Sequence, residues 1–151
     1  MKIVDFLSPK CIRISDEEMN KKRMLDLLAG IAAEETGLDK RAVLDALIER
    51  ERLGTTGVGR GVALPHTRLP NLKKIFCAFV RTKPIDFEAV DEKPVDLFFL
   101  LLVPEKDGAD HLKALARLSR ILRNESLAES LRRAQSCDEI YRLIRENDTD
   151  E

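Results

Sequence analysis

The feature that most constrains the fold is the apolar run Val95 to Val103, in which only Asp96 is polar. A continuous run of this kind is typical of a β-strand buried on both faces, because a strand with one wet face would alternate apolar and polar residues. Its uninterrupted part, Leu97 to Val103, is far too short to span a bilayer, which takes about 20 residues. Pro104 ends the run, which therefore predicts a central strand covered by helices on both faces.

Other patterns supply the layers around this strand. Apolar residues recur at helical spacing in five segments: one that stops near Gly37, one that ends at Gly54, one from His111 to Leu122, and two shorter ones at 126–134 and 138–144. In the helix after His111, the residues Leu112, Leu115, Leu118, Ile121 and Leu122 form the expected buried stripe. Val62 to Leu64 and Ile75 to Thr82 predict two further strands. The connection from Thr82 to Val95 is too short for a crossover helix, so we expect a mixed sheet.

Composition limits the class of protein. A chain of 151 residues with 44% hydrophobic content can bury one core, so we expect a single α/β domain over 1–146, its mixed central sheet flanked by helices, and a disordered acidic tail at 147–151. The formal net charge of −1 gives no electrostatic reason to expect nucleic acid or a membrane surface as partner. The 3 cysteines are widely separated and fit a reducing cytoplasm rather than a disulfide framework or zinc site. No targeting segment or membrane insertion is expected.

The stretch Gly54 to Arg68 concentrates glycine and then reaches a histidine. Gly57, Gly59 and Gly61 alternate with other residues, and glycine lets backbone N–H groups approach a phosphate closely. The P-loop lysine and hydroxyl are absent, however, and a helix precedes these glycines where a dinucleotide site has a strand. Spacing alone therefore favours a tight-turning or flexible connection from helix to strand over a nucleotide site.

The chain has two histidines, His66 and His111. Pro65 restricts the residue before it to extended geometry, so His66 should stand at a strand end, where α/β proteins commonly bind ligands. The alternative is a surface turn histidine satisfied by water. His111 lies in the first turn of a helix, and its alternative role is to cap that helix while facing inward. With no third ligand candidate near either histidine, we expect no metal and no other cofactor.

Basic residues gather after His111. They are Lys113, Arg117 and Arg120 on one helical stripe, followed by Arg123, Arg132 and Arg133. Charges at helical spacing usually form a solvated face, and the alternative is a docking surface for an acidic protein.

The segment RERLGTTGVGRGVALPH, Arg50 to His66, closely resembles the active-site signature of the type-2 enzyme IIA domains of the bacterial phosphoenolpyruvate-dependent phosphotransferase system (PTS). This is the fructose- and mannitol-type group that includes the nitrogen-regulatory enzyme IIA. The strand VDLFFLLLVPE and the helix opening DHLKALARLSRIL also look like this family, in the expected order. The resemblance thus covers most of the chain.

The resemblance implies a type-2 enzyme IIA fold and a phosphohistidine relay. His66 matches the phospho-accepting histidine, which takes a phosphoryl group on Nε2 from the phosphocarrier HPr or its nitrogen-branch counterpart NPr. Arg50 matches the active-site arginine, His111 the second active-site histidine, and Thr55 a hydroxyl near the phosphoryl oxygens. The implied onward partner is a regulatory protein, or a sugar-specific IIB component if the chain serves transport.

These residue types suit that chemistry. A neutral imidazole can attack phosphorus in line, and an arginine fork with a histidine at a helix N-terminus can compensate the charge on the equatorial oxygens. On this interpretation, the alternating glycines leave room for the partner's phosphohistidine to approach. A phosphorylation-independent binding module with the same fold is the third hypothesis, after the regulatory and the transport phosphocarrier.

Overall fold

The computed structural model describes residues 1–106 and 108–149. Its elements, in chain order, are a short 3-10 helix η1 (Ile3–Asp5), β1 (Leu7–Ile14), α1 (Lys21–Thr36), α2 (Lys40–Arg52), β2 (Gly57–Gly59), β3 (Val62–Ala63), β4 (His66–Leu69), β5 (Phe76–Ile85), β6 (Val95–Pro104), α3 (Ala109–Leu122), α4 (Glu125–Arg133) and α5 (Cys137–Asn147). Within the described residues, the strands form one 6-stranded sheet in the order β1-β5-β6-β3-β2, with β4 also paired to β6.

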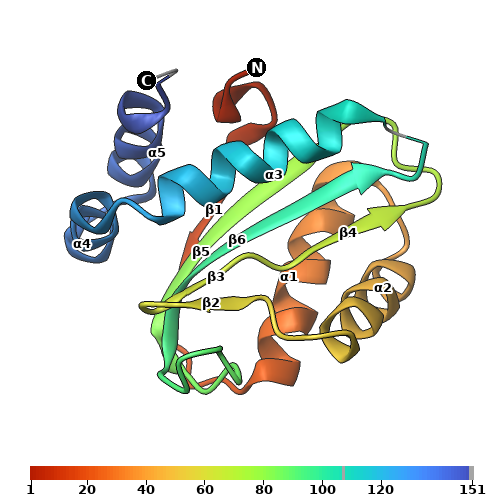
Figure 1. Ribbon diagram of the computed structural model, residues 1–151. Helices are drawn as coiled ribbons and strands as arrows, with labels where there is room; N and C mark the ends of the chain where they lie inside the picture. The colour runs from red at the N-terminus through yellow and green to blue at the C-terminus, as the bar shows by residue number, and fades with distance from the viewer. Residues whose placement is uncertain (107, 150–151) are drawn as a thin grey trace.

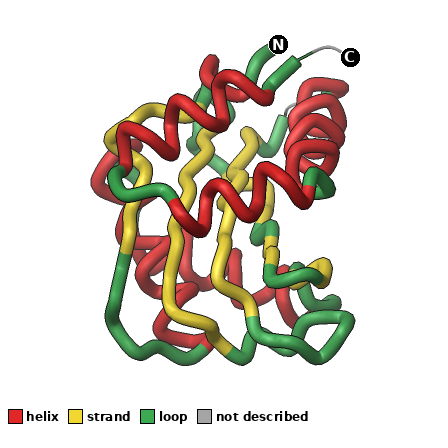
Figure 2. Tube along the Cα trace, turned by 90° about the vertical axis from the view of Figure 1, so that its left-hand side faces the viewer, coloured by secondary structure: helices red, strands yellow, loops and turns green. Residues whose placement is uncertain are grey.

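The sheet lies between two layers of helices (Figures 1 and 2). α1 and α2 cover one face and α3 crosses the other, while α4 and α5 lie at the end of the molecule where α5 packs against β1. β5 and β6 are antiparallel, whereas β1 runs parallel to β5, and β3 and β4 run parallel to β6. The predicted single α/β domain with a mixed sheet is therefore confirmed.

The central strand is β6, as its apolar run predicts. Every residue from Leu97 to Val103 is buried, because helices cover both faces of the sheet at this point. Phe79 of β5 and Phe99 of β6 pack with ring centroids 4.8 Å apart, and Phe98 meets Phe87 edge-on at 5.2 Å. The first ring pair packs β5 against β6, and the second packs the segment that connects these strands against β6.

Local signals set the ends of the first two helices. The side chain of Asn20 accepts a hydrogen bond from the backbone N–H of Arg23 at the start of α1, which ends at Gly37 in the left-handed conformation (φ 77°). Asp39 then caps α2 through the N–H of Ala42. The two helices therefore follow each other at once, as their periodicity predicts.

β1, β2 and β4 are not among the three predicted strands. β2 is short and rich in glycine, and β4 has the sequence HTRL, so neither shows the apolar pattern by which a strand is recognised. Both pair with strands that are already fixed, β2 with β3 and β4 with β6. Their conformation thus depends on tertiary pairing rather than on local propensity.

One residue of the predicted stripe on α3 faces solvent. Leu112 is 66% exposed, whereas Leu118 and Ile121 are buried. Leu112 precedes Ile121 by about two and a half turns, which places it on the opposite side of the helix. The buried face is built around Ala114, Leu118 and Ile121 instead.

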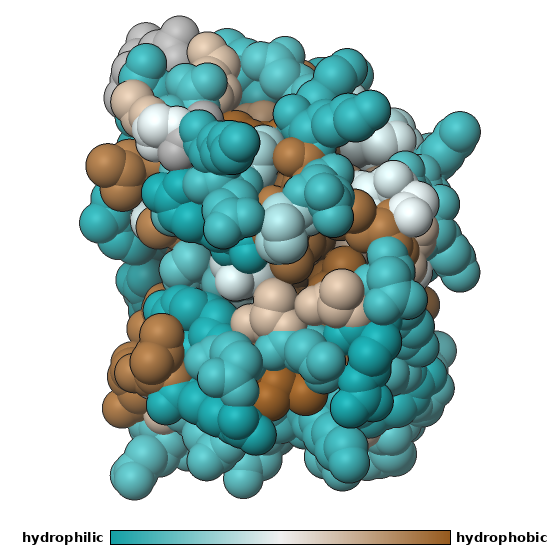
Figure 3. Space-filling view, turned by 90° about the vertical axis from the view of Figure 1, so that its right-hand side faces the viewer, coloured by the Kyte–Doolittle hydropathy of each residue, from teal (hydrophilic) through white to brown (hydrophobic). Residues whose placement is uncertain are grey.

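Apolar side chains are also found on the surface of the molecule. Figure 3 shows them as brown patches on one largely hydrophilic face.

The chain end is more ordered than its composition suggests. α5 extends to Asn147, and Asp148 is only 4% exposed. Its carboxylate accepts hydrogen bonds of 2.5 Å from Arg117 of α3 and from the backbone N–H of Ile3. The predicted disordered tail at 147–151 therefore does not begin at 147; residues 150 and 151 lie outside the described residues.

Candidate functional site

His66 follows a break in the chain's pairing with β6. β3 runs beside β6 with Ala63 opposite Phe98, and β4 resumes the same parallel pairing with His66 opposite Leu101. Between them the chain leaves the ladder at Leu64 and Pro65, although the Pro65 carbonyl still accepts the N–H of Leu101 at 2.9 Å. His66 is thus the first residue of β4, and the backbone before and after it is hydrogen-bonded to β6.

A hydrogen bond fixes the tautomer of His66. Its Nδ1 lies 2.8 Å from the carbonyl oxygen of Leu64. A carbonyl can only accept, so Nδ1 carries the proton and Nε2 keeps its lone pair in the neutral ring. Burial lowers the pKa of His66 below its ordinary value, with Arg50 and His111 also lowering it and the Leu64 carbonyl and Glu51 raising it. Near neutral pH the ring is therefore mainly uncharged.

Arg50 and His111 come from two different helices, and both act electrostatically on His66. Arg50 lies in the last turn of α2, where its Nη1 donates to the carbonyl of Gly54 at 2.9 Å. His111 lies in the first turn of α3, and its Nδ1 is buried. Both residues lower the pKa of His66, so their side chains lie within electrostatic range of its ring. The guanidinium of Arg50 and the N-terminus of α3 together suit an anion.

Thr55 braces the loop that follows α2. Its hydroxyl donates to the carbonyl of Phe87 at 3.2 Å and accepts the N–H of Gly57 at 3.0 Å. The hydroxyl proton is therefore already used within the protein, and a role on a phosphoryl oxygen requires this bond to be exchanged.

The alternating glycines have structural reasons of their own. A Cβ on Gly57 would lie 2.9 Å from the backbone of Ala89, and one on Gly61, at φ 79°, would lie 2.5 Å from Nη2 of Arg132. They form the β2–β3 hairpin, in which Gly57 pairs with Ala63. Close internal packing and a tight turn are therefore sufficient reasons for Gly57 and Gly61.

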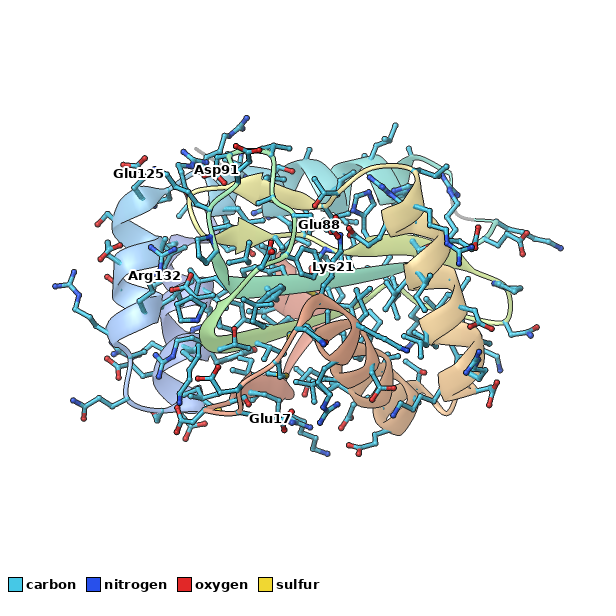
Figure 4. The ribbon with its side chains drawn as sticks, turned by 90° about the horizontal axis from the view of Figure 1, so that it is seen from below. Glu17, Lys21, Glu88, Asp91, Glu125 and Arg132 are labelled. Carbon is cyan, nitrogen blue, oxygen red and sulfur yellow. The ribbon has the colours of Figure 1, made fainter. Side chains whose placement is uncertain are left out.

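Sequence reasoning missed Glu51 and Lys21. The Glu51 side chain is 7% exposed, and its carboxylate lies 2.9 Å from Nζ of Lys21 at the start of α1. Lys21 also pairs at 3.4 Å with Glu88, which is 75% exposed, as Figure 4 shows from below. A signal exists in the sequence, because Glu51 follows Arg50 in the last turn of a helix, where the dipole disfavours a carboxylate.

The structure uses several of the predicted basic residues internally. Arg117 binds the buried Asp148, and Arg120 donates to the carbonyl of Thr149. Arg132 forms a two-bond pair with Asp96 at 2.8 and 3.0 Å. These cations are therefore poorly suited to a docking surface for an acidic protein.

Two further observations apply to residues 1–106 and 108–149 alone. They contain no group of three or more His, Cys, Asp or Glu side chains arranged to hold a metal ion. None of their helices has the length and apolar character needed to cross a membrane.

Comparison with known proteins extends the likeness to nearly the whole chain. The family model for the EIIA 2 component of the phosphoenolpyruvate-dependent sugar phosphotransferase system matches residues 5–147. The chain is 51% identical over 145 residues to a nitrogen regulatory protein of Bradyrhizobium diazoefficiens, with 95% of each chain covered. It superposes on the crystal structure of the nitrogen regulatory protein IIA-Ntr from Neisseria meningitidis with a TM-score of 0.89 and 37% identity, covering 94% of this chain and 98% of that one.

A more distant structure is the complex of the mannitol enzyme IIA and its phosphorylated IIB from Escherichia coli. The TM-score is 0.75 at 18% identity, covering 91% of this chain and 95% of that chain, and this likeness concerns the fold alone. The family model, the Bradyrhizobium relative and the Neisseria IIA-Ntr structure all indicate the same family. The chain therefore belongs to the type-2 enzyme IIA family, in its nitrogen-regulatory IIA-Ntr group, and is a phosphocarrier component of the phosphotransferase system.

Proposed function

We propose that Nε2 of His66 accepts a phosphoryl group from the phosphohistidine of an HPr-type or NPr-type carrier. The observation that carries this proposal is the 2.8 Å bond from Nδ1 to the Leu64 carbonyl, because it leaves Nε2 as the nucleophilic nitrogen. In the transfer, the P–N bond on the carrier breaks and its electron pair returns to the carrier's imidazole. A new P–Nε2 bond forms on His66, whose Nδ1 keeps its proton.

Arg50 and His111 stabilise the charge of the transferred group. The Arg50 guanidinium donates one N–H to Gly54 and has others in the same planar fork for the equatorial oxygens. His111 offers a ring at the N-terminus of α3, where the helix dipole also favours an anion. The Thr55 hydroxyl can also donate to a phosphoryl oxygen once it gives up its hydrogen bond to the Phe87 carbonyl.

The regulatory role follows from the relatives. The nitrogen regulatory proteins are 35–51% identical to this chain over almost its whole length, which favours control of other proteins by contact in the cytoplasm. The IIA domains of this family act with phosphocarrier and IIB proteins. Onward transfer to a sugar-specific IIB component is therefore the second candidate function.

A transfer assay tests the proposal. The purified chain is incubated with phosphoenolpyruvate, enzyme I and either carrier, and acid-labile phosphate is followed by intact mass. We expect one phosphate on the wild type, none on His66→Ala, and about a hundredfold slower labelling of Arg50→Ala. Arg41→Ala, on the exposed face of α2, serves as the matched control.

Two results separate the alternatives. Labelling that persists in His66→Ala, or that fails with both carriers, contradicts the relay. Rapid passage of the phosphate to a purified IIB domain would instead assign the chain to sugar transport.

A further inference from the structure

A continuous set of contacts joins the start of α1 to the His66 ring. We name it the Glu51 network, after its buried carboxylate; its members are Lys21, Glu51, Thr56, Leu64 and His66. Lys21 pairs with Glu51 Oε2 at 2.9 Å, and Glu51 accepts the Thr56 N–H at 3.2 and 3.3 Å together with the Thr56 hydroxyl. The Thr56 carbonyl accepts the Leu64 N–H at 2.9 Å, and the Leu64 carbonyl accepts Nδ1 of His66 at 2.8 Å.

The links of this network are buried or partly buried. Thr56 is 2% and Leu64 is 4% exposed, and the side chains of Glu51 and Lys21 are 7% and 19% exposed. Water therefore does not readily replace these bonds, and a lost partner leaves a buried polar group unsatisfied. The network is consequently stiff where it meets His66.

Local helix preferences do not explain either charged member. Glu51 places a carboxylate in the last turn of α2, and Lys21 places a cation in the first turn of α1, so both oppose the helix dipole. A polar or charged residue that breaks a local rule is often found where a site requires it. Here the two charges compensate each other and meet at the loop that leads to His66.

We propose that Glu51, with Thr56, is a positioning residue that holds the Leu64 carbonyl in place and thereby keeps His66 in the tautomer that presents Nε2. Glu51 itself touches neither phosphate nor partner in this scheme. It fixes Thr56, Thr56 fixes the N–H of Leu64, and the carbonyl of Leu64 fixes the ring. The inference deepens the proposed function and rests on it for the use of Nε2, but the tautomer is measurable without any transfer.

The test compares four variants in the unphosphorylated protein and in the transfer assay. Glu51→Ala removes every contact of the carboxylate, Glu51→Gln keeps an acceptor for Thr56 but removes the charge, and Thr56→Val removes only the hydroxyl. Glu88→Gln is the matched control, because Glu88 contacts the same Lys21 from a 75% exposed position. Long-range 1H–15N NMR reports which nitrogen of His66 is protonated, and hydrogen exchange reports the protection of the Leu64 amide.

We expect Glu51→Ala to mix the two neutral tautomers of His66, to speed exchange of the Leu64 amide about tenfold or more, and to slow phosphoryl transfer by about ten- to a hundredfold. Glu51→Gln and Thr56→Val should show the same changes in smaller degree, and Glu88→Gln none. The isosteric variants decide the matter if Glu51→Ala does not fold.

The proposal is overturned if the folded variants keep the wild-type tautomer and Leu64 exchange within twofold, or if Glu88→Gln perturbs them equally. Failure of the proposed function would look different. In that case the tautomer would respond to Glu51 as expected, but no variant, nor the wild type, would be labelled on His66.

Discussion

The buried carboxylate of Asp148 provides a sharp test of how the chain end contributes to the fold. We predict that Asp148→Ala lowers the free energy of unfolding by about 3–5 kcal/mol, the usual cost of removing one partner from a buried ion pair. The Asp148 side chain is 1% exposed and that of Arg117 is 11% exposed, so solvent screens their pairing little. The Ile3 N–H also loses its acceptor, which places the loss toward the upper end of that range.

Chemical denaturation followed by circular dichroism measures this loss. With about 2–4 °C of melting temperature per kcal/mol for a chain of this size, the variant should also melt about 6–20 °C below the wild type. Glu146→Ala is the matched control, since its i,i+4 pair with Arg142 is 53% exposed and should contribute less than about 1 kcal/mol. Replacing both partners, as in Asp148→Leu with Arg117→Met, should recover much of the loss.

A loss below about 1 kcal/mol for Asp148→Ala would refute this reasoning. It would mean that residues 148 and 149 contribute no more than an exposed tail. A double variant less stable than Asp148→Ala alone would equally contradict the account of a compensated charge pair.

Three further predictions concern the site and its supports. Gly61→Ala should lower the free energy of unfolding by about 1–3 kcal/mol, because the residue has φ 79° and its Cβ would meet Arg132 and Asp96. Gly30→Ala in α1 should stabilise the protein, because its Cβ would make only ordinary contacts. Equal melting temperatures for the two variants would contradict this prediction. The NMR titration midpoint of His66 should lie below pH 6.5, since burial and nearby positive charge disfavour the imidazolium. The rate of phosphoryl acceptance should therefore stay constant from about pH 8 to 6.5 and fall only at lower pH. A midpoint at or above pH 6.5 would contradict this prediction. Leu112→Ser should change the free energy of unfolding by less than about 0.5 kcal/mol, because Leu112 is exposed, whereas Leu118→Ala should lower it by about 2–5 kcal/mol. A larger loss for Leu112→Ser than for Leu118→Ala would contradict the assignment of Leu112 to the exposed face of α3.

The parts of the fold that local patterns encode were predictable. The run from Leu97 to Val103 identifies the central strand, because only a strand covered on both faces can be apolar throughout. Gly37 ends its helix as expected, since a left-handed residue is needed there. Arg50, His66 and His111 were proposed as site residues through resemblance to a family motif, whereas spacing alone left the role of both histidines open.

What could not be predicted depends on distant partners. β4 has no strand pattern and exists because β6 offers it a parallel edge. Asp148 looks like part of an acidic tail until α3 and the N-terminal segment supply Arg117 and Ile3. The pairing of Glu51 with Lys21 joins residues of two helices whose packing is not encoded in either segment alone. In each case a polar group is satisfied by a residue far away in sequence, and hydrophobic periodicity carries no information on such pairs.

The most direct test of the central claim is to locate the phosphate on the His66 ring. The chain is labelled with 15N-histidine, phosphorylated by phosphoenolpyruvate, enzyme I and its carrier, and examined by 31P and 15N NMR at alkaline pH, where phosphohistidine persists. We predict one phosphohistidine, at His66, with the 31P–15N coupling on Nε2 and the proton retained on Nδ1. Phosphate on Nδ1 of His66, or on His111 in its place, would contradict the account.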